Sequence, residues 1–304
     1  MIIIAKNYGQ LGNRLFLFAH LIAAAREYET KLSNPSFAEY AHLFPSTAGD
    51  LWCRYPNEGE AVGKPERQDR RRKFFSKVTY VATKSLAVMG VNRLPLPGLP
   101  IQIIRLQPEQ ECDLGSDTFA SSTRSHHLLL QGWMFRSERL LQKHAAEVRA
   151  HFEIQSENRR NVEQVVQRLR GEADVMVGVH IRHGDYATFM DGRYFFSVDQ
   201  YVDAMRKIVA QLPGKRVAFL VCSNAKTKAS DFAGLNVHFG PGHITEDMYA
   251  MAEADLLIGP PSTYTGWASF YGDVPLVVLK QADQSIDLAS VTISNARLQP
   301  AGAA

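Results

Sequence analysis

The second half of the chain alternates short apolar runs with longer amphipathic segments. The apolar runs have the length and β-branched content of buried strands. They are VMVGVHI (175–181), VAFLVCS (217–223), NVHF (236–239), DLLIG (255–259) and VPLVVL (274–279). Three segments between or after them, 198–212, 245–254 and 263–271, repeat apolar residues at helical spacing. Nearly continuous apolar strands separated by helices predict a parallel sheet covered by helices on both faces.

The first half begins with the same pattern and then becomes less regular. IIIA (2–5) predicts a strand that leads through a glycine-bearing turn into a helix over residues 11–25, where apolar residues recur three and four positions apart. Glycine and proline at 56–75, followed by a basic run, predict an irregular middle. From about residue 138 a long helical stretch, interrupted at 154–156, is expected to end at Gly171.

Length and composition narrow the class of protein. A chain of 304 residues with 45% hydrophobic and 21% charged residues is typical of a globular protein of about two domains. The 34 basic and 31 acidic side chains nearly balance, which excludes the whole molecule as an electrostatic partner for nucleic acid. Three separated cysteines, Cys53, Cys112 and Cys222, fit buried thiols in a reducing compartment better than a disulfide framework.

The N-terminal sequence MIIIAKNYGQ has no signal-peptide features, and no apolar run reaches the about 18 residues of a membrane span. We therefore expect a cytoplasmic protein. The basic run at 67–84, RQDRRRKFFSKVTYVATK, leaves two interpretations open. It is either a solvated helix face or loop, or a patch for an anionic acceptor or for the inner face of a membrane, since Phe74, Phe75 and Tyr80 lie among its charges.

Polar residues follow the ends of four predicted strands, where ligands of open parallel sheets bind. These residues are Arg182, then Ser223 and Asn224, then residues 240–242, then Ser262 and Thr263. The guanidinium of Arg182 suits a diphosphate, and the start of the helix at 263 suits an anion. The pattern predicts a site for a nucleotide diphosphate. The alternatives are a structural ion pair of Arg182 with Asp185 and a purely capping role for Ser262.

Four segments, in the same order, resemble the alpha-1,2/alpha-1,6 fucosyltransferase superfamily. VGVHIRHGDY (177–186) looks like its HxRRGDY motif, and GQLGNRLFLFA (9–19) is similar to the GxLGNQLFQYA signature of the bacterial alpha-1,2-fucosyltransferase family. LQGWMFRSERLLQKHAAEVRAHF (130–152) resembles the central GYFQS segment of that family, and ITEDMYAMAEADLLIGPPSTYTGWASFY (244–271) its ED and SSFSWW region. Together these segments span residues 9–271.

The resemblance implies an α/β fold of the GT-B type, with two Rossmann-like domains facing each other across a cleft. The domains would be 1–155, on the acceptor side, and 156–290, which would bind the GDP-sugar, with a tail at 291–304. The implied reaction is an inverting transfer of L-fucose from GDP-beta-L-fucose to a sugar hydroxyl, in alpha-1,2 linkage to galactose of a surface glycan precursor. Members need no metal or cofactor, and the chain has no DxD motif.

The resemblance also assigns roles by motif. Arg182 would hold the β-phosphate and stabilise the leaving GDP, His180 would shape the sugar–phosphate pocket, and Asp247 would accept from the guanine N1–H and N2–H₂. From their positions just after the strand, Asp185 and Asp191 are the two candidates for a general base, and Asp185 would alternatively orient Arg182, which is the role that we favour. The remaining donor-binding residues would be His183, Asn224, Ser262, Thr263, and from the other domain Gly9, Gly12 and Asn13.

Two departures from the family pattern keep alternatives open. His183 stands where the motif has its second arginine, which exchanges a permanent charge for one that depends on pH. PPSTYTGW replaces NSSFSWW. The alternatives are a transferase for another GDP-sugar and a non-catalytic GDP-sugar binding protein.

Overall fold

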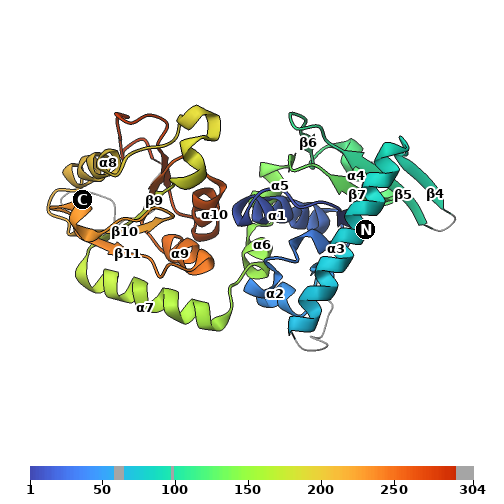
Figure 1. Ribbon diagram of the computed structural model, residues 1–304, viewed down its shortest axis with the longest axis horizontal. Helices are drawn as coiled ribbons and strands as arrows, with labels where there is room; N and C mark the ends of the chain where they lie inside the picture. Colours follow the sequence, from blue (N-terminus) through green and yellow to red (C-terminus); the bar gives the residue numbers. More distant parts are fainter. Residues whose placement is uncertain (58–64, 97–98, 292–304) are drawn as a thin grey trace. The chain divides into compact units, whose positions relative to one another are not determined.

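The computed structural model describes residues 1–57, 65–96 and 99–291. The chain divides into two compact units, Met1–Gln155 and a second unit that begins at Ser156. Both units are α/β, and Figure 1 colours the first from blue to green and the second from green to red. The tail expected at 291–304 lies, apart from its first residue, outside the described residues.

The second unit contains a five-stranded, fully parallel sheet in the order β11-β10-β9-β12-β13. Its strands are β9 Val175–Ile181, β10 Val217–Ser223, β11 Val237–Phe239, β12 Leu256–Gly259 and β13 Leu276–Val278. All five strands predicted from the apolar runs are therefore confirmed. Numbered along the chain the order is 3-2-1-4-5, so the direction of winding reverses between β9 and β12, and sheets of this kind bind ligands at that reversal.

Helices cover both faces of this sheet, as the sequence pattern predicted (Figure 1). The helices are α7 Ser156–Glu172, α8 Val198–Ala210, α9 Ile244–Met251 and α10 Thr263–Gly272, with 3₁₀ turns at Gly184–Ala187, Phe189–Gly192 and Ala229–Phe232. Val175, Val177 and Val179 pack in one core with the apolar side of α8. Because side chains alternate along a strand, His180 faces the opposite side, where α9 and α10 lie.

The first unit contains a six-stranded sheet in the order β3-β2-β1-β7-β5-β4. Its strands are β1 Ile2–Ile4, β2 Leu32–Ser33, β3 Arg54–Tyr55, β4 Arg93–Leu96, β5 Leu99–Arg105 and β7 His127–Gln131. The four inner strands are parallel, and β3 and β4 pair antiparallel at the two edges. The predicted first strand and first helix are confirmed as β1 and α1 Leu11–Glu27.

The other elements of the first unit, apart from α3 Pro65–Val88, are short. They are α2 Pro45–Ala48, α4 Asp117–Ser125, α5 Glu138–Lys143, α6 Ala145–His151, 3₁₀ turns at Pro35–Phe37 and Ala41–Leu43, and a two-stranded parallel sheet of β6 Cys112–Asp113 and β8 Phe135–Arg136. The helical stretch predicted from residue 138 is broken at His144 as well as after His151, and α7 ends one residue beyond Gly171. At His144 the chain leaves helical geometry while its ring binds Glu27 of α1.

One expectation for the first unit is wrong. The middle of this half, expected to be irregular, contains the longest described helix, α3 Pro65–Val88. Within its basic segment Arg72, only 1% exposed, donates hydrogen bonds to the carbonyls of Thr47, Ala48 and Asp50, which hold one side of the helix against residues 47–50. Among the described residues, no helix has both the length and the apolar character that a membrane crossing requires.

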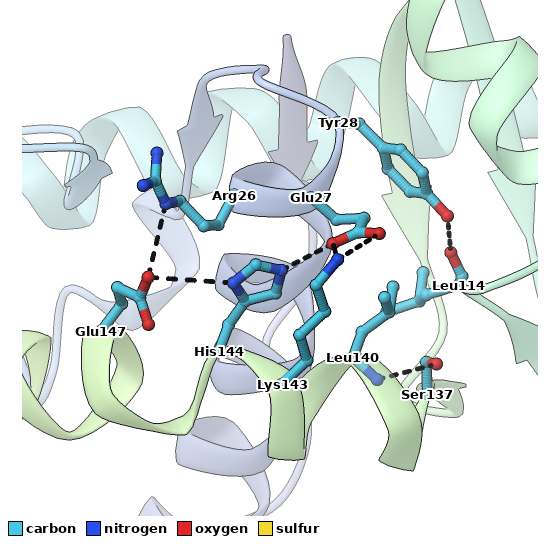
Figure 2. A network of polar contacts seen from close by, with 9 residues as sticks. All are labelled: Arg26, Glu27, Tyr28, Leu114, Ser137, Leu140, Lys143, His144 and Glu147. Atoms are coloured by element: carbon cyan, nitrogen blue, oxygen red, sulfur yellow. Dashed lines mark hydrogen bonds and ion pairs between the residues drawn. The ribbon is translucent and has the colours of Figure 1, made fainter.

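Ion pairs join the end of α1 to α5 and α6, as Figure 2 shows. Glu27 accepts from Lys143 Nζ at 2.7 Å and contacts His144 Nε2 at 2.7 Å. Arg26 Nε lies 3.4 Å from Glu147. The hydrogen bond from Lys143, followed by that from His144, lowers the pKa of Glu27. These contacts fix the segment that follows β8 against the first helix.

His151 lies in an aromatic cluster with Phe18, Phe152 and Tyr55, at ring separations of 5.0–5.5 Å. Its buried Nε2 has no hydrogen-bond partner among the described residues. Burial lowers the pKa of His151 to about 4, against a smaller opposing effect of Asp50. The folded protein therefore holds this ring neutral at pH values where the unfolded chain is protonated.

We expect the free energy of unfolding to fall as the pH is lowered from about 6.5 toward 4, because the unfolded chain then binds a proton that folded His151 does not. At pH 5 this effect should amount to about 2 kcal/mol. His151→Phe keeps the aromatic packing and should lose this part of the pH dependence. Urea unfolding at pH 7 and pH 5 tests this, and an equal pH dependence of the variant and the wild-type protein would contradict it.

Candidate functional site

The sequence-predicted site residues of the second unit gather where its sheet changes winding direction. Arg182 follows β9, and Ser262 and Thr263 begin α10 directly after the neighbouring strand β12. The hydroxyl of Tyr186 donates to the carbonyl of Pro261, so the segments after the two strands are in contact. The structure therefore brings the guanidinium and the start of α10 to the same edge of the sheet.

The guanidinium of Arg182 is held in a fixed orientation. Its Nε and Nη2 donate to the two carboxylate oxygens of Asp185 at 3.0 and 3.1 Å. The 3₁₀ turn Gly184–Ala187 brings Asp185 back onto Arg182, and Gly184 provides the positive φ of +57° that this turn uses. The ring of Tyr186 lies 5.6 Å from the guanidinium carbon. The ion pair that the sequence raised as an alternative is present.

His180 is buried next to this guanidinium and is neutral. Its Nδ1 lies 2.5 Å from the hydroxyl of Thr265, and its ring centroid is 5.0 Å from that of Tyr264. Burial, and then the charge of Arg182, lowers the pKa of His180 to about 3. A neutral imidazole can orient a ligand through its dipole and hydrogen bonds but adds no positive charge at neutral pH.

His183 and Asn224 are linked through the backbone. The His183 N–H donates to Asn224 Oδ1 at 2.8 Å, which joins the segment after β9 to the segment after β10. The His183 ring lies 4.4 Å from the ring of Phe195, stacked on it, and its Nε2 is 2.8 Å from the Phe196 carbonyl. His183, which stands at the position of the motif's second arginine, is thus held by residues that follow it in the same loop.

Asp247 lies in the first turn of α9, beside the glycine-bearing loop after β11. Its Oδ1 accepts from the Gly242 N–H at 2.8 Å, and burial raises the pKa of this carboxyl group. A Cβ atom at Gly240 would lie 2.4 Å from that oxygen and 2.8 Å from Cys222 Sγ, so only glycine fits there. The loop and the carboxylate therefore form one packed unit.

The position of α9 is set by a buried carboxylate from its first turn. Glu246, which is buried, accepts from the side-chain amides of Asn158 and Asn161 of α7, both at 2.8 Å. Two amide donors satisfy a carboxylate that burial would otherwise disfavour. This contact fixes the helix that carries Asp247.

Ser262 caps α10. Its backbone is extended, and its Oγ accepts from the Tyr264 N–H at 3.2 Å. The capping role raised as an alternative is therefore present, and the ten-residue helix that Thr263 begins presents the positive end of its dipole to the same edge as Arg182.

The predicted residues of the first unit form a compact turn after β1. Gly9 has φ +62°, and a Cβ atom there would lie 2.0 Å from Asn13 Nδ2, so the side chain of Asn13 packs directly over Gly9. Gly12 is buried in the first turn of α1. Arg14 donates through Nε to the Gly9 carbonyl at 3.1 Å and pairs with Glu39 at 2.9 Å. The role of this turn toward a donor remains a prediction.

The first unit also contains a cavity of about 560 Å³ that the sequence did not predict. It is lined by His20, Glu111, Asp113, Gly115, Met134, Arg136, Ser137, Glu138 and Arg139. None of the predicted donor-binding residues lines it. Within residues 1–57, 65–96 and 99–291, no group of three or more His, Cys, Asp or Glu side chains could hold a metal ion.

Sequence reasoning missed several residues around Arg182. Thr265, Tyr264 and Tyr186 contact His180, Arg182 or the loops that carry them. Tyr186 belongs to the same VHIRHGDY stretch as Arg182, so its position was a usable signal. The sequence contained no such signal for Thr265, because its contact with His180 joins residues 85 positions apart.

No protein-family profile matches the chain, and no curated protein matches it. Solved structures do match. FUT1 of Arabidopsis thaliana, as a mutant in complex with GDP, is 15% identical, with a TM-score of 0.58, over 95% of this chain and 73% of that chain. The fucosyltransferase NodZ from Bradyrhizobium is 16% identical, with a TM-score of 0.53, over 91% of this chain and 94% of that chain.

POFUT1 in complex with GDP-fucose is 12% identical, with a TM-score of 0.52, over 90% of this chain and 94% of that chain. At these identities the matches establish a shared fold. The expected α/β fold of the GT-B type is thereby confirmed, with a parallel sheet in the second unit and a mainly parallel sheet in the first. The narrower resemblance to the alpha-1,2 family stays a prediction.

Thr265→Val should lower the free energy of unfolding by about 1–3 kcal/mol, because it leaves the buried His180 Nδ1 without its partner. Thr265→Ser keeps the hydroxyl and should remain near the wild-type value. Chemical unfolding of the three proteins at pH 7 measures the effect. Equal losses in Val and Ser variants would mean that packing, and not the hydrogen bond, matters at this position.

Proposed function

We propose that this protein is an inverting fucosyltransferase that uses GDP-beta-L-fucose. The observation that carries the proposal is the guanidinium of Arg182, oriented by Asp185 at the winding reversal of the second sheet, beside the start of α10. A fixed cation and a helix N-terminus at one edge suit a diphosphate. The fold shared with FUT1 in complex with GDP and POFUT1 in complex with GDP-fucose supports the choice of donor.

In the proposed reaction, a hydroxyl oxygen of the acceptor forms a bond to the anomeric carbon of fucose. The bond from that carbon to the β-phosphate oxygen breaks, and its electron pair leaves with GDP. Negative charge grows on the diphosphate as this bond stretches, so a cation already in place stabilises the transition state more than the ground state. Because the bond to the leaving group breaks ahead of bond formation by the acceptor, the acceptor needs little help from a base. Its hydroxyl proton passes to the departing phosphate or to water.

The contacts of Asp185 support an orienting role. Both of its oxygens already accept from Arg182, so accepting the acceptor proton would disrupt the ion pair. His180, neutral because it is buried, would shape the pocket without competing for the charge. The backbone contact between His183 and Asn224 would hold the loop that carries Arg182.

The acceptor that we propose is a galactose unit of a surface glycan precursor in the cytoplasm, joined in alpha-1,2 linkage. The four motif segments between residues 9 and 271 support this choice. An alpha-1,6-fucosyltransferase has the same fold, so the fold leaves the linkage open, and product analysis decides it.

Arg182→Ala should lower kcat by about a hundredfold to a thousandfold, because it removes a donor to the leaving diphosphate. The assay is release of GDP from GDP-fucose with a panel of beta-galactosides as acceptors. Arg216→Ala is the matched control, because Arg216 also pairs with an aspartate, Asp174, but at the amino-terminal end of β10. It should retain wild-type turnover.

Wild-type turnover by Arg182→Ala would contradict the proposal that Arg182 stabilises the leaving diphosphate. Donor binding by the wild-type protein without any GDP release would instead favour a non-catalytic binding protein. Faster release from another GDP-sugar would replace fucose as the donor.

We expect Asp247→Asn to weaken GDP binding by at least about tenfold and to remove the preference for GDP over IDP. A carboxylate accepts from both N1–H and N2–H₂ of guanine, and hypoxanthine lacks the second donor. Asparagine can still accept from the Gly242 N–H, so the loop should stay ordered. Calorimetric titration with the two nucleotides measures the ratio, and an unchanged ratio would place guanine recognition elsewhere.

A further inference from the structure

Helix α3 has one face that is packed against the first unit. Arg72 is held by three backbone carbonyls, and Thr83, which is also buried, lies eleven residues further along the same side. The Phe75 ring lies 4.6 Å from Trp52, and Lys6 Nζ lies 6.0 Å from the Tyr80 ring. These contacts fix the rotation of α3 about its axis, and with it the identity of the outward face.

The outward face carries an exposed apolar stripe. Phe74, Val78 and Val81 are spaced by four and three residues, so they lie side by side on the helix, and Val88 continues the row. Phe74 is 62% exposed and Val88 82% exposed. Met89, directly after the helix, is exposed as well. Exposed apolar side chains that adjoin one another on a fixed helix face indicate a surface that contacts a partner.

The charge around this stripe is positive from residue 70 onward, and the two acidic residues of α3, Glu66 and Asp69, lie in the first five residues of the helix. Lys73, Lys77 and Lys84 form an exposed row along one side of the stripe, and Arg70 and Arg71 are exposed near the start of the helix. From residue 70 to its end at Val88, α3 contains six Lys and Arg residues, of which Arg72 is buried, and no Asp or Glu. The surface of α3 is therefore basic, although the whole chain has a net charge of only +3.

We infer that the outward face of α3 binds the surface of an anionic lipid bilayer. Lysines beside an apolar stripe match the two layers of such a surface, because the charges meet anionic headgroups while Phe74 and the valines enter the acyl boundary. A second copy of the chain fits poorly, because two such faces would repel each other. A nucleic acid would use the lysines but not the apolar stripe.

The test is co-sedimentation of the full chain with vesicles of phosphatidylcholine alone or with a quarter of phosphatidylglycerol. Wild-type protein should bind the anionic vesicles, and binding should weaken as salt is raised. Lys77→Glu with Lys84→Glu should lower the partition coefficient at least about tenfold. Phe74→Ser with Val81→Ser should cause a loss of similar size at constant charge.

Arg160→Glu with Arg168→Glu is the matched control, because it makes the same change in net charge on exposed positions of α7. This variant should bind like the wild-type protein. A second readout is amide hydrogen exchange, which should slow in residues 70–89 when anionic vesicles are added. GDP release with soluble acceptors should be unchanged in all three double variants, so failure of this inference and failure of the proposed function are distinguishable.

Several results would overturn the inference. Equal binding to neutral and anionic vesicles, or an equal loss in the α7 control, would mean that the lysines of α3 do not determine association. Wild-type binding by the Phe74 and Val81 variant, together with binding to RNA, would indicate a site for a polyanion. A dimer that dissociates on Phe74→Ser would indicate a second copy as the partner.

Discussion

The bidentate ion pair between Arg182 and Asp185 is the contact on which the candidate site depends. A free arginine side chain samples many rotamers, and fixing it costs entropy that a ligand would otherwise have to offset. The turn at Gly184–Ala187 orients the guanidinium before any ligand arrives. Because the pair lies where the sheet order reverses, the oriented charge meets the dipole of α10 at one edge.

The groups beneath this charge are arranged so that they do not oppose it. The imidazole of His180 is buried and neutral, and Thr265 satisfies its Nδ1. A protonated imidazole beside Arg182 would repel the guanidinium. Farther along the edge, Gly240 allows the carboxylate of Asp247 to pack against the loop after β11. The charge of Arg182 thus lies at the edge of the sheet, and the neutral His180 adds no charge to the core below it.

In helix α3 one buried arginine determines which side of a basic segment faces the solvent. Taken alone, residues 67–84 are a row of charges with a few aromatic residues among them. Arg72 differs from the other basic residues of the segment, because its guanidinium donates hydrogen bonds to the carbonyls of Thr47, Ala48 and Asp50. The side of the helix that carries Arg72 therefore faces the rest of the unit. The opposite side is then left with the apolar stripe and the lysines.

The sequence by itself determined the second unit and the position of its polar edge. Apolar runs of β-branched residues specify buried strands, and the residues next to each strand end are adjacent to it in the chain, so Arg182 and Ser262 were predictable. Only the tertiary structure decided that Thr265 meets His180, that Phe196 engages His183 and that 65–88 is a helix with a buried arginine. These outcomes depend on which groups, distant in the sequence, form hydrogen bonds with buried polar atoms. Hydrophobic periodicity does not indicate which groups pair in this way.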